Sequence, residues 1–264
     1  MEHNYKHLIV TTEGKVLRVA LNRPEVHNAF NQELIEEITA VFTGIAKGTE
    51  PEVRAVVLSG EGKSFCAGAD VNWMKASLEF SDDENKADAT RLAKMLEAVE
   101  SCPCPVVAAV HGSALGGGAG LIAACDIVIA AQGTRFAFSE AKLGIAPAVI
   151  SPFVVRKIGV GHARALFLTA ERFDSDRALQ IGLVHRVVGA DELDSEVQRE
   201  IGEILTASPA AIPVIKSLLA TLPLCSAEDA RTVTVETIAR LRTSPEGQEG
   251  LRAFLEKRKP GWAE

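Results

Sequence analysis

The pattern of apolar and polar positions divides the chain into a region of alternating strands and helices and a region of helices alone. Short apolar runs rich in β-branched residues predict strands at 7–12, 15–22, 53–59, 106–110 and 126–131. Longer segments predict helices, by apolar periodicity or by small residues, at 32–46, 83–102 and 116–125. Apolar runs without alternation are typical of strands covered on both faces, so we expect βαβ units and an α/β fold.

Beyond about residue 150 the pattern is helical almost throughout. Helices are predicted at 152–158, 161–168, 175–181, 191–207, 209–222, 227–242 and 247–258. Pro209 and Pro245 mark breaks, because the residue before a proline is disfavoured in a helical conformation. We therefore expect an α/β core over residues 1–200 and a helical C-terminal region over residues 201–264. The second region has too few helices for a core of its own.

Charge and cysteine content narrow the classes of partner. The 264 residues include 28 Lys and Arg against 35 Asp and Glu, a formal net charge of −7. That balance argues against a nucleic-acid partner, which usually requires a basic face. The five cysteines form no CxxC pair, so neither a disulfide framework nor a zinc site is indicated, and we expect no metal. A reducing cytoplasm is the natural compartment.

No membrane association is expected either. The run 106–131 is long and mostly apolar, but it contains His111, Asp126 and many glycines, which argue against a membrane span. The first four residues have neither a basic start nor an apolar stretch, so no signal peptide is expected.

Two segments rich in small residues follow predicted strands and are candidates for ligand contact. The first, 64–70, reads SFCAGAD, and its small side chains let a ligand approach the backbone closely. The second, 111–120, reads HGSALGGGAG and enters a helix, where backbone N–H groups suit a developing negative charge. It lacks the final Lys-Ser/Thr of a phosphate-binding P-loop. Taken singly, each segment is also consistent with a plain loop or with tight packing.

Together the two segments resemble the crotonase (enoyl-CoA hydratase/isomerase) superfamily, and the resemblance covers nearly the whole chain. It extends to 21–29 (LNRPEVHNA), 136–144 (FAFSEAKLG) and 253–260 (AFLEKRKP). The resemblance implies a spiral of ββα turns with a helical C-terminal region, which would make trimer and coenzyme A contacts. It also implies an acyl-CoA thioester as substrate, no separate cofactor, and a homotrimer or homohexamer.

The resemblance also implies roles for particular residues. The N–H groups of Ala69 and Gly117 would form an oxyanion hole for the thioester carbonyl, and one such donor typically lowers the barrier by about 3–4 kcal/mol. Glu140 would be the catalytic acid and base, and its apolar neighbours favour a raised pKa. The residues expected to contact coenzyme A are Arg23, Asn28, Ala29, Ala67, Ala69, Asp70, Val71, Phe254 and Lys257.

Position 120 departs from the family pattern. Family hydratases use two glutamates, and the first would fall at Gly120, which cannot transfer a proton. One carboxylate is enough to move a proton between carbons, so an enoyl-CoA isomerase is an alternative. However, segments 68–74, 84–89, 140–152 and 167–173 resemble bacterial methylglutaconyl-CoA and related glutaconyl-type hydratases of leucine and isoprenoid breakdown. That similarity favours reversible addition of water to a branched 2-enoyl-CoA of the 3-methylglutaconyl-CoA type.

A dicarboxylic substrate would need a cation near its acyl end, for which Lys75 and Arg156 are candidates. A remote alternative is RNA binding, reported for some family members through lysines on the helix after the first small-residue segment. Here the stretch 71–83 carries only Lys75 as a cation, against three acidic residues. Phosphate binding needs several cations in register, so RNA is not an expected partner.

Overall fold

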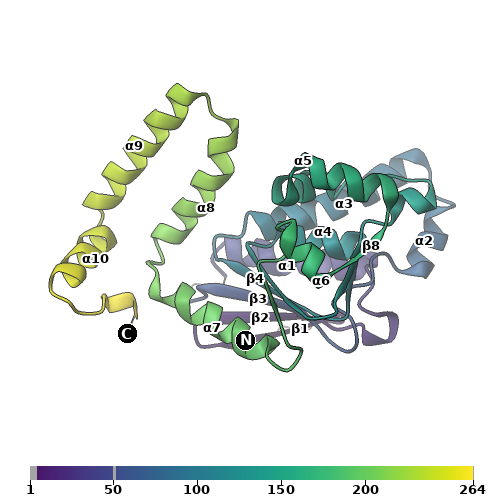
Figure 1. Ribbon diagram of the computed structural model, residues 1–264, viewed down its shortest axis with the longest axis horizontal. Coiled ribbons are helices and arrows are strands. Elements are labelled where there is room, and N and C mark those ends of the chain that lie inside the picture. Colours follow the sequence, from purple (N-terminus) through teal and green to yellow (C-terminus); the bar gives the residue numbers. More distant parts are fainter. Residues whose placement is uncertain (1–4, 50–51, 264) are drawn as a thin grey trace. The chain divides into compact units, whose positions relative to one another are not determined.

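The structure is a computed structural model that describes residues 5–49 and 52–263 (Figure 1). The chain forms two compact units, Met1–Gln198 and Arg199–Glu264. The first four residues, where no signal peptide is expected, lie outside the described part. The first unit is α/β, and the second consists of helices, as the apolar pattern indicated.

A six-stranded sheet forms the base of the first unit. Its strands are β1 (Leu8–Glu13), β2 (Val16–Leu21), β3 (Ala55–Gly60), β4 (Val106–Val110), β6 (Ile127–Ala131) and β9 (Arg186–Val188), side by side in that order. β1 and β2 form an antiparallel hairpin, and each later strand is parallel to its neighbour. All five residues of β4 are buried, as expected for a central strand covered on both faces.

A second, three-stranded sheet was not predicted. It contains β5 (Ser113–Leu115), β7 (Arg135–Ala137) and β8 (Arg172–Asp174), in the order β5-β7-β8. Each strand has three residues, too few to show a period of two in the sequence. β5 is also bridged to the 64–70 segment through Cys66 and Ala114, so this small sheet reaches the candidate site.

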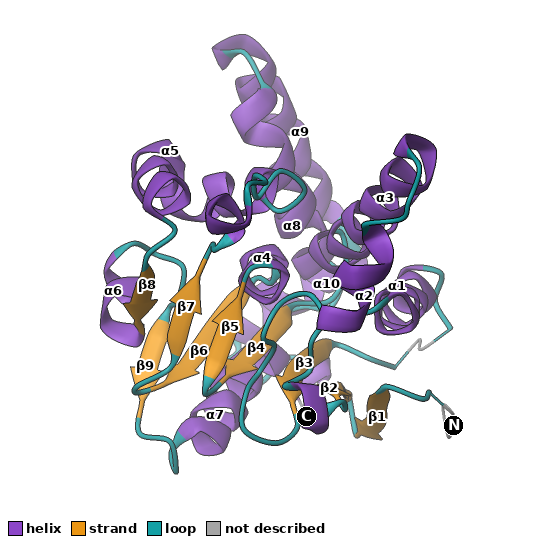
Figure 2. Cartoon of the chain, turned by 90° about the vertical axis from the view of Figure 1, so that its right-hand side faces the viewer, coloured by secondary structure: helices purple, strands orange, loops and turns teal. Residues whose placement is uncertain are grey.

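Helices α1 (Gln32–Ala46), α3 (Asp82–Glu100) and α4 (Gly117–Ala124) lie on the same side of the larger sheet (Figure 2). α1 begins where the sequence predicts, because Asn31 caps it by accepting from the N–H of Leu34. Every residue of α4 after Gly117 is buried, since small residues allow the helix to pack closely on all sides. The other helices that begin in this unit are α2 (Val71–Ser77), α5 (Ser151–Thr169), α6 (Ser175–Gln180) and α7 (Leu193–Thr206).

α5 contains a break that the sequence anticipates. Gly159 has φ 74° and ψ 157°, so the continuous span holds two helical pieces close to the predicted 152–158 and 161–168. The short 3-10 helices are η1 (Pro24–Val26), η2 (Glu140–Leu143), η3 (Leu222–Leu224) and η4 (Gly261–Ala263).

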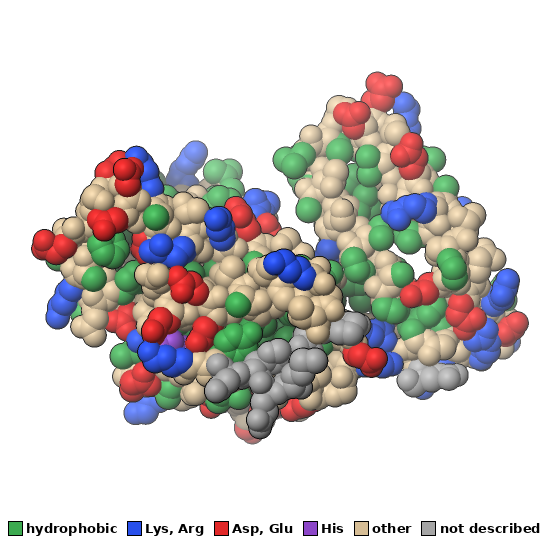
Figure 3. Space-filling view, turned by 180° about the vertical axis from the view of Figure 1, so that it is seen from behind, with side chains coloured by type: hydrophobic (Ala, Val, Ile, Leu, Met, Phe, Trp, Pro, Cys, Tyr) green, Lys and Arg blue, Asp and Glu red, His purple; other side chains and the backbone are tan. Residues whose placement is uncertain are grey.

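The second unit contains α8 (Ala211–Thr221), α9 (Ala227–Thr243) and α10 (Pro245–Leu255). Neither α8 nor α9 has a fully buried residue. Hydrophobic side chains are visible along these helices (Figure 3), and the large exposed ones on α8 and α9 are Ile215, Leu219, Val235 and Ile238. In the described part, no single helix is long and apolar enough to cross a membrane. Only Leu193–Thr206 together with Ala211–Leu224, bent by 100°, satisfies the length and composition for a span.

Candidate active site

The two segments rich in small residues lie side by side in the first unit. The N–H of Cys66 donates to the carbonyl oxygen of Ser113, and the carbonyl of Cys66 accepts from the N–H of Leu115, both at 3.0 Å. This parallel pairing brings Ala69 and Gly117 to the same end of the two segments, each three residues beyond the bridge. The pairing therefore joins two stretches that are almost 50 residues apart in sequence.

At that end, the N–H groups of Ala69 and Gly117 have no hydrogen-bond partner among the described residues. Gly117 is the first residue of α4, where backbone N–H groups lack an intrahelical acceptor. Beside Ala69, the carbonyl of Gly68 and the N–H of Asp70 both pair with Phe30 instead, at 2.7 and 2.9 Å. Ala69 is exposed and Gly117 is half-buried, so neither residue is enclosed in the core.

Tight packing explains why glycines are required where the two segments meet. A Cβ on Gly117 would lie 3.0 Å from Cδ2 of Phe30, and one on Gly118 would lie 2.6 Å from the carbonyl oxygen of Cys66. Gly68 has φ +96°, a conformation that residues with a Cβ rarely adopt. Phe30, which no sequence pattern singled out, packs against both segments.

Glu140 provides the carboxyl group of the site. It begins η2, separated from the end of β7 by two residues, and its Oε1 atom lies 3.4 Å from the position that a Cβ on Gly116 would occupy. Its Oε2 atom is buried and has no hydrogen-bond partner in the described part of the chain. Burial raises the pKa of Glu140, because the charged form loses its hydration. A carboxyl group poised in this way, at the N-terminus of α4, is suited to accept and return a proton.

Position 120 has no room for a side chain. A Cβ on Gly120 would lie 2.3 Å from Cγ2 and 2.7 Å from Cβ of Ile150, whose side chain is 2% exposed. The absence of a glutamate at position 120 therefore leaves no empty space in the site, because Ile150 occupies the space that a side chain would enter. Nothing in the spacing or the apolar pattern of the sequence indicated this contact.

Arg23, Asn28 and Asp70, three of the residues predicted to contact coenzyme A, form a buried network within the protein. Nη2 of Arg23 lies 2.8 Å from Oδ2 of Asp70, and the backbone N–H of Arg23 donates to Oδ1 of Asn28 at 2.8 Å. Nδ2 of Asn28 donates to the carbonyls of Glu61 and Ser64, both at 2.8 Å. These side chains hold the site segments together, so contact with coenzyme A would go through their backbone.

Asp70 is ionised despite its burial. Desolvation alone would raise the pKa of this carboxyl group. However, the guanidinium of Arg23 and the N–H of Asn72, which donates at 2.8 Å, hold the pKa below its ordinary value. The same hydrogen bond makes Asp70 the N-cap of α2, so the helix begins at the next residue, Val71.

The other residues predicted to contact coenzyme A differ in exposure. In the first unit, Ala29 is buried, Ala67 is half-buried and Val71 is 64% exposed. Phe254 and Lys257 belong to the second unit, and both are exposed. Lys257 stands in the left-handed region, at φ 55°, just after α10.

Two cations considered for ligand binding or close to such a residue, Arg258 and Arg156, are engaged in ion pairs. Arg258, next to Lys257, makes a bidentate pair with Glu249 and lowers the pKa of that carboxyl group to about 2. Arg156 pairs with Glu100 at 2.6 Å. Lys75 on α2 is exposed. Within the described residues, no group of three or more His, Cys, Asp or Glu side chains is arranged to hold a metal ion.

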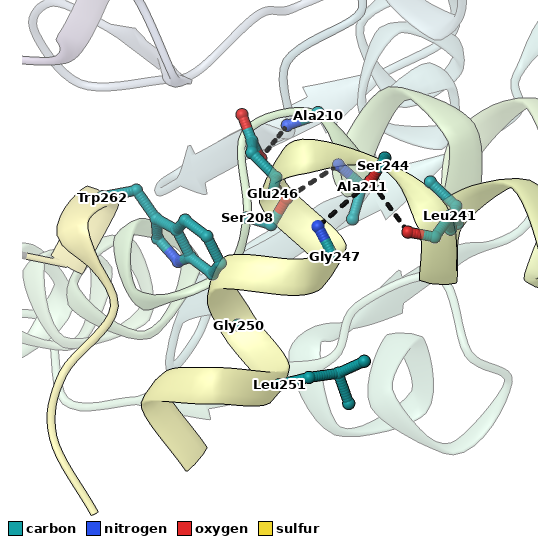
Figure 4. Close-up of a pocket in the computed structure, with 10 residues that line it drawn as sticks. All are labelled: Ser208, Ala210, Ala211, Leu241, Ser244, Glu246, Gly247, Gly250, Leu251 and Trp262. Carbon is teal, nitrogen blue, oxygen red and sulfur yellow. Dashed lines mark hydrogen bonds between the residues drawn. The ribbon is translucent and has the colours of Figure 1, made fainter. Parts of the chain in front are cut away.

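A cavity of about 270 Å³ lies within the second unit, between the ends of α9 and α10 and Trp262 (Figure 4). The carboxylate of Glu246 there accepts hydrogen bonds from the hydroxyl of Ser208 and from the N–H of Ala210, which tie α10 to the start of α8. None of the residues predicted to act in catalysis or binding lines this cavity. Its lining residues all belong to the second unit, so the cavity lies where helices of that unit meet.

Two unpaired backbone amides beside a desolvated carboxyl group characterise enzymes that hold an oxyanion while a carboxylate moves a proton. The sequence model of the enoyl-CoA hydratase/isomerase family matches residues 11–264. The chain belongs to this family, whose substrates are acyl-CoA thioesters.

Relatives of known name and structure agree with this assignment. The chain is 35% identical over 254 residues to the short-chain-enoyl-CoA hydratase of Clostridium acetobutylicum, covering 96% of this chain and 95% of that protein. It is 34% identical over 257 residues to the crotonyl-CoA hydratase of Syntrophomonas wolfei, covering 97% of each. The crystal structure of an enoyl-CoA hydratase from Shewanella pealeana superposes with a TM-score of 0.94 at 39% identity, over 99% of this chain and 97% of that chain. The crotonase-like fold expected from the sequence is thereby confirmed.

Proposed function

We propose that this enzyme adds water reversibly to a 2-enoyl-CoA, with Glu140 as its single acid–base residue. The observation that carries the proposal is the buried, unpartnered Oε2 atom of Glu140, located at the helix end whose first N–H is free. The hydratase names of the relatives favour water addition over other reactions of the family.

The chemistry follows from these groups. The thioester carbonyl oxygen would accept hydrogen bonds from the N–H groups of Ala69 and Gly117. The Glu140 carboxylate would take a proton from water while the water oxygen bonds to C3, and the electron pair of the double bond would move into the enolate. Protonated Glu140 would then return the proton to C2. One carboxyl group serves both steps if hydroxyl and proton add to the same face.

A second candidate is isomerisation of an enoyl-CoA double bond, favoured by the packing of Ile150 against Gly120. With no second carboxylate at position 120, Glu140 would remove a proton from C2 of a 3-enoyl-CoA. The resulting dienolate would be held by the same two amides, and Glu140 would return the proton to C4. The substrate loses and regains one proton, so its mass is unchanged.

For the acyl group we propose a branched chain of the 3-methylglutaconyl-CoA type, which would place the enzyme in leucine breakdown. The support is the similarity of the 140–152 segment to glutaconyl-type hydratases. Such a substrate carries a second carboxylate, and exposed Lys75 is the candidate cation for it. Arg156 is the weaker candidate, because it already pairs with Glu100.

We further propose a cytoplasmic homotrimer or homohexamer. The support is the number of large apolar side chains exposed on α8 and α9, since exposed apolar surface is often covered by a partner subunit. In such an assembly, Phe254 and Lys257 of one copy would reach the coenzyme of another.

The test is to incubate the protein with crotonyl-CoA, a 3-enoyl-CoA and 3-methylglutaconyl-CoA, and to analyse the products by mass spectrometry. Gain of one water on any substrate supports the hydratase, and the preferred substrate identifies the acyl group. The Glu140→Gln variant is the control for background hydration. If the only product has the mass of its substrate and a shifted double bond, the isomerase replaces the hydratase.

A further inference from the structure

Ile150 and Glu140 approach α4 from the same segment of chain. Glu140 lies against Gly116 at the start of the helix, and Ile150 lies against Gly120. The N–H of Gly120 donates to the carbonyl of Gly116, so the two contact points are about one helical turn apart, about 6 Å along the axis. Ile150 is thus the residue that covers the next turn of the helix beside the carboxyl group.

We infer that Ile150 is a positioning residue for the reaction: it fills the face of α4 next to Glu140, keeps bulk water and any second acid group off that side of the carboxyl group, and leaves proton transfer with the reacting water to Glu140 alone. This inference rests on the role proposed for Glu140 and extends it. It explains why the site lacks a second carboxylate, since an apolar side chain occupies the room that one would need.

The surroundings of Glu140 point to exclusion of water as the controlling factor. The main cause of its raised pKa is burial, and no charged neighbour contributes. α4 has no titratable residue, and Lys142 on η2 is exposed. The first half of α5 carries Arg156 and Lys157. Arg156 pairs with Glu100, and Lys157 donates to two carbonyl oxygens at the far end of α4. Apolar side chains therefore supply the cover of this carboxyl group, and Ile150 packs on α4 one turn beyond the position that Glu140 contacts.

The first experiment measures the titration of Glu140 directly. Infrared difference spectra against Glu140→Gln isolate this carboxyl group, and they are recorded for the wild type, Ile150→Val and Ile150→Ala. Removing the isoleucine side chain admits water, so the pKa of Glu140 should fall toward its ordinary value, more in Ile150→Ala than in Ile150→Val. The acid limb of the pH profile of kcat/KM should move to lower pH in the same order.

Ile158→Ala is the matched control. Ile158 is equally deep in the core, at 4% exposed against 2% for Ile150, and stands on the same helix two turns further on. It should lower the unfolding temperature about as much as Ile150→Ala without moving the titration of Glu140. An unchanged Glu140 titration in Ile150→Ala would reduce Ile150 to a core residue and overturn the inference.

The contact itself is tested by a double-mutant cycle. Gly120→Ala alone should lower both the unfolding temperature and turnover, because its Cβ would collide with Ile150. In Gly120→Ala/Ile150→Ala, both should return to the level of Ile150→Ala alone. Gly120→Glu should fail for the same reason, and Gly120→Glu/Ile150→Ala should add water to crotonyl-CoA faster than either single variant. Absence of rescue in both double variants would contradict the inference.

These measurements separate the inference from the proposed function. If the protein adds water to no substrate, the proposed function fails, but the infrared titration still reports whether Ile150 controls Glu140. If water addition is found and the titration does not respond, only the inference about Ile150 fails.

Discussion

The guanidinium of Arg23 lies 2.8 Å from the carboxylate of Asp70, and the two side chains are only 11% and 6% exposed. The pair joins the segment after β2 to the start of α2, directly after Ala69 in the chain. Loss of one partner would leave the other charge buried and unpaired, which typically costs about 3–5 kcal/mol.

We therefore predict that Arg23→Ala lowers the free energy of unfolding by about 3–5 kcal/mol, measured by denaturant titration. Lys86→Ala is the control, because Lys86 and its partner Asp82 form an exposed pair, at 69% and 84% exposure. Exposed pairs contribute about 0–1 kcal/mol. Equal losses in the two variants would show that burial of the Arg23–Asp70 pair has no energetic consequence.

The same pair predicts a particular response to acid. The folded-state pKa of Asp70 is lower than its ordinary value of 3.8, so the unfolded chain binds this proton more readily. The resulting stability is complete above about pH 3.8 and is lost as the pH falls through the lower folded value. The stability gap between the wild type and Asp70→Asn should accordingly narrow on acidification below this pH. A gap that stays constant down to acid unfolding would contradict the prediction.

Local signals predicted the elements that carry their own cap or period. α1 was predicted from six apolar positions at helical spacing, and the structure adds the cap at Asn31; β4 was predicted from an unbroken apolar run. The strands of the smaller sheet were not predicted, because three residues are too few to show an alternating pattern. α2 was not predicted either, because it has seven residues and no buried side chain.

In the candidate site, sequence alone located the small-residue segments and Glu140, through their resemblance to a family. It did not indicate that Ile150 packs on Gly120 or that Phe30 pairs with the Gly68–Asp70 backbone. Both are contacts between distant positions, and neither leaves a trace in local spacing. The burial of Arg23 could not be predicted for the same reason, since an arginine in a loop is ordinarily expected to be exposed and free to bind a ligand.

Glu140→Gln should abolish turnover. General acid–base catalysis contributes about 10²–10⁴-fold, and glutamine cannot transfer the proton. The variant should bind coenzyme A nearly as tightly as the wild type, because the side chain differs little in shape. In the wild type, kcat/KM should rise with pH through a pKa above the ordinary 4.5 of a glutamate, since the ionised form is the base that starts the reaction. Full activity of Glu140→Gln in the product assay would refute the catalytic assignment.

Gly117→Ala tests the oxyanion hole. The added Cβ would lie 3.0 Å from the ring of Phe30, so the ring or the backbone of residue 117 must shift by a small amount. Loss of one oxyanion donor typically lowers kcat by about 10²–10³-fold, and we expect a loss of that order with a smaller change in KM. Phe30→Leu in the same chain should recover part of kcat by giving the Cβ room.

Gly161→Ala is the matched control for Gly117→Ala, because a Cβ at Gly161 would meet no atom within 4 Å. It should keep the kcat of the wild type. If Gly117→Ala also kept it, the amide of Gly117 would not contact the thioester carbonyl.

Substitutions at Lys257 can separate the contribution of its charge to coenzyme A binding from the contribution of its backbone conformation to stability. The residue has φ 55°, a left-handed conformation that glycine adopts without the steric cost borne by other residues. Lys257→Gly should therefore unfold at the same or a higher temperature than the wild type, with a gain of about 0–1 kcal/mol at most. If the lysine binds the coenzyme, the same variant should bind coenzyme A more weakly, and the difference should shrink at high salt as the charge is screened. Lys257→Arg, which keeps the charge, should retain most of the affinity. Coenzyme A affinity equal to that of the wild type in Lys257→Gly would remove Lys257 from the binding site, whatever its effect on stability.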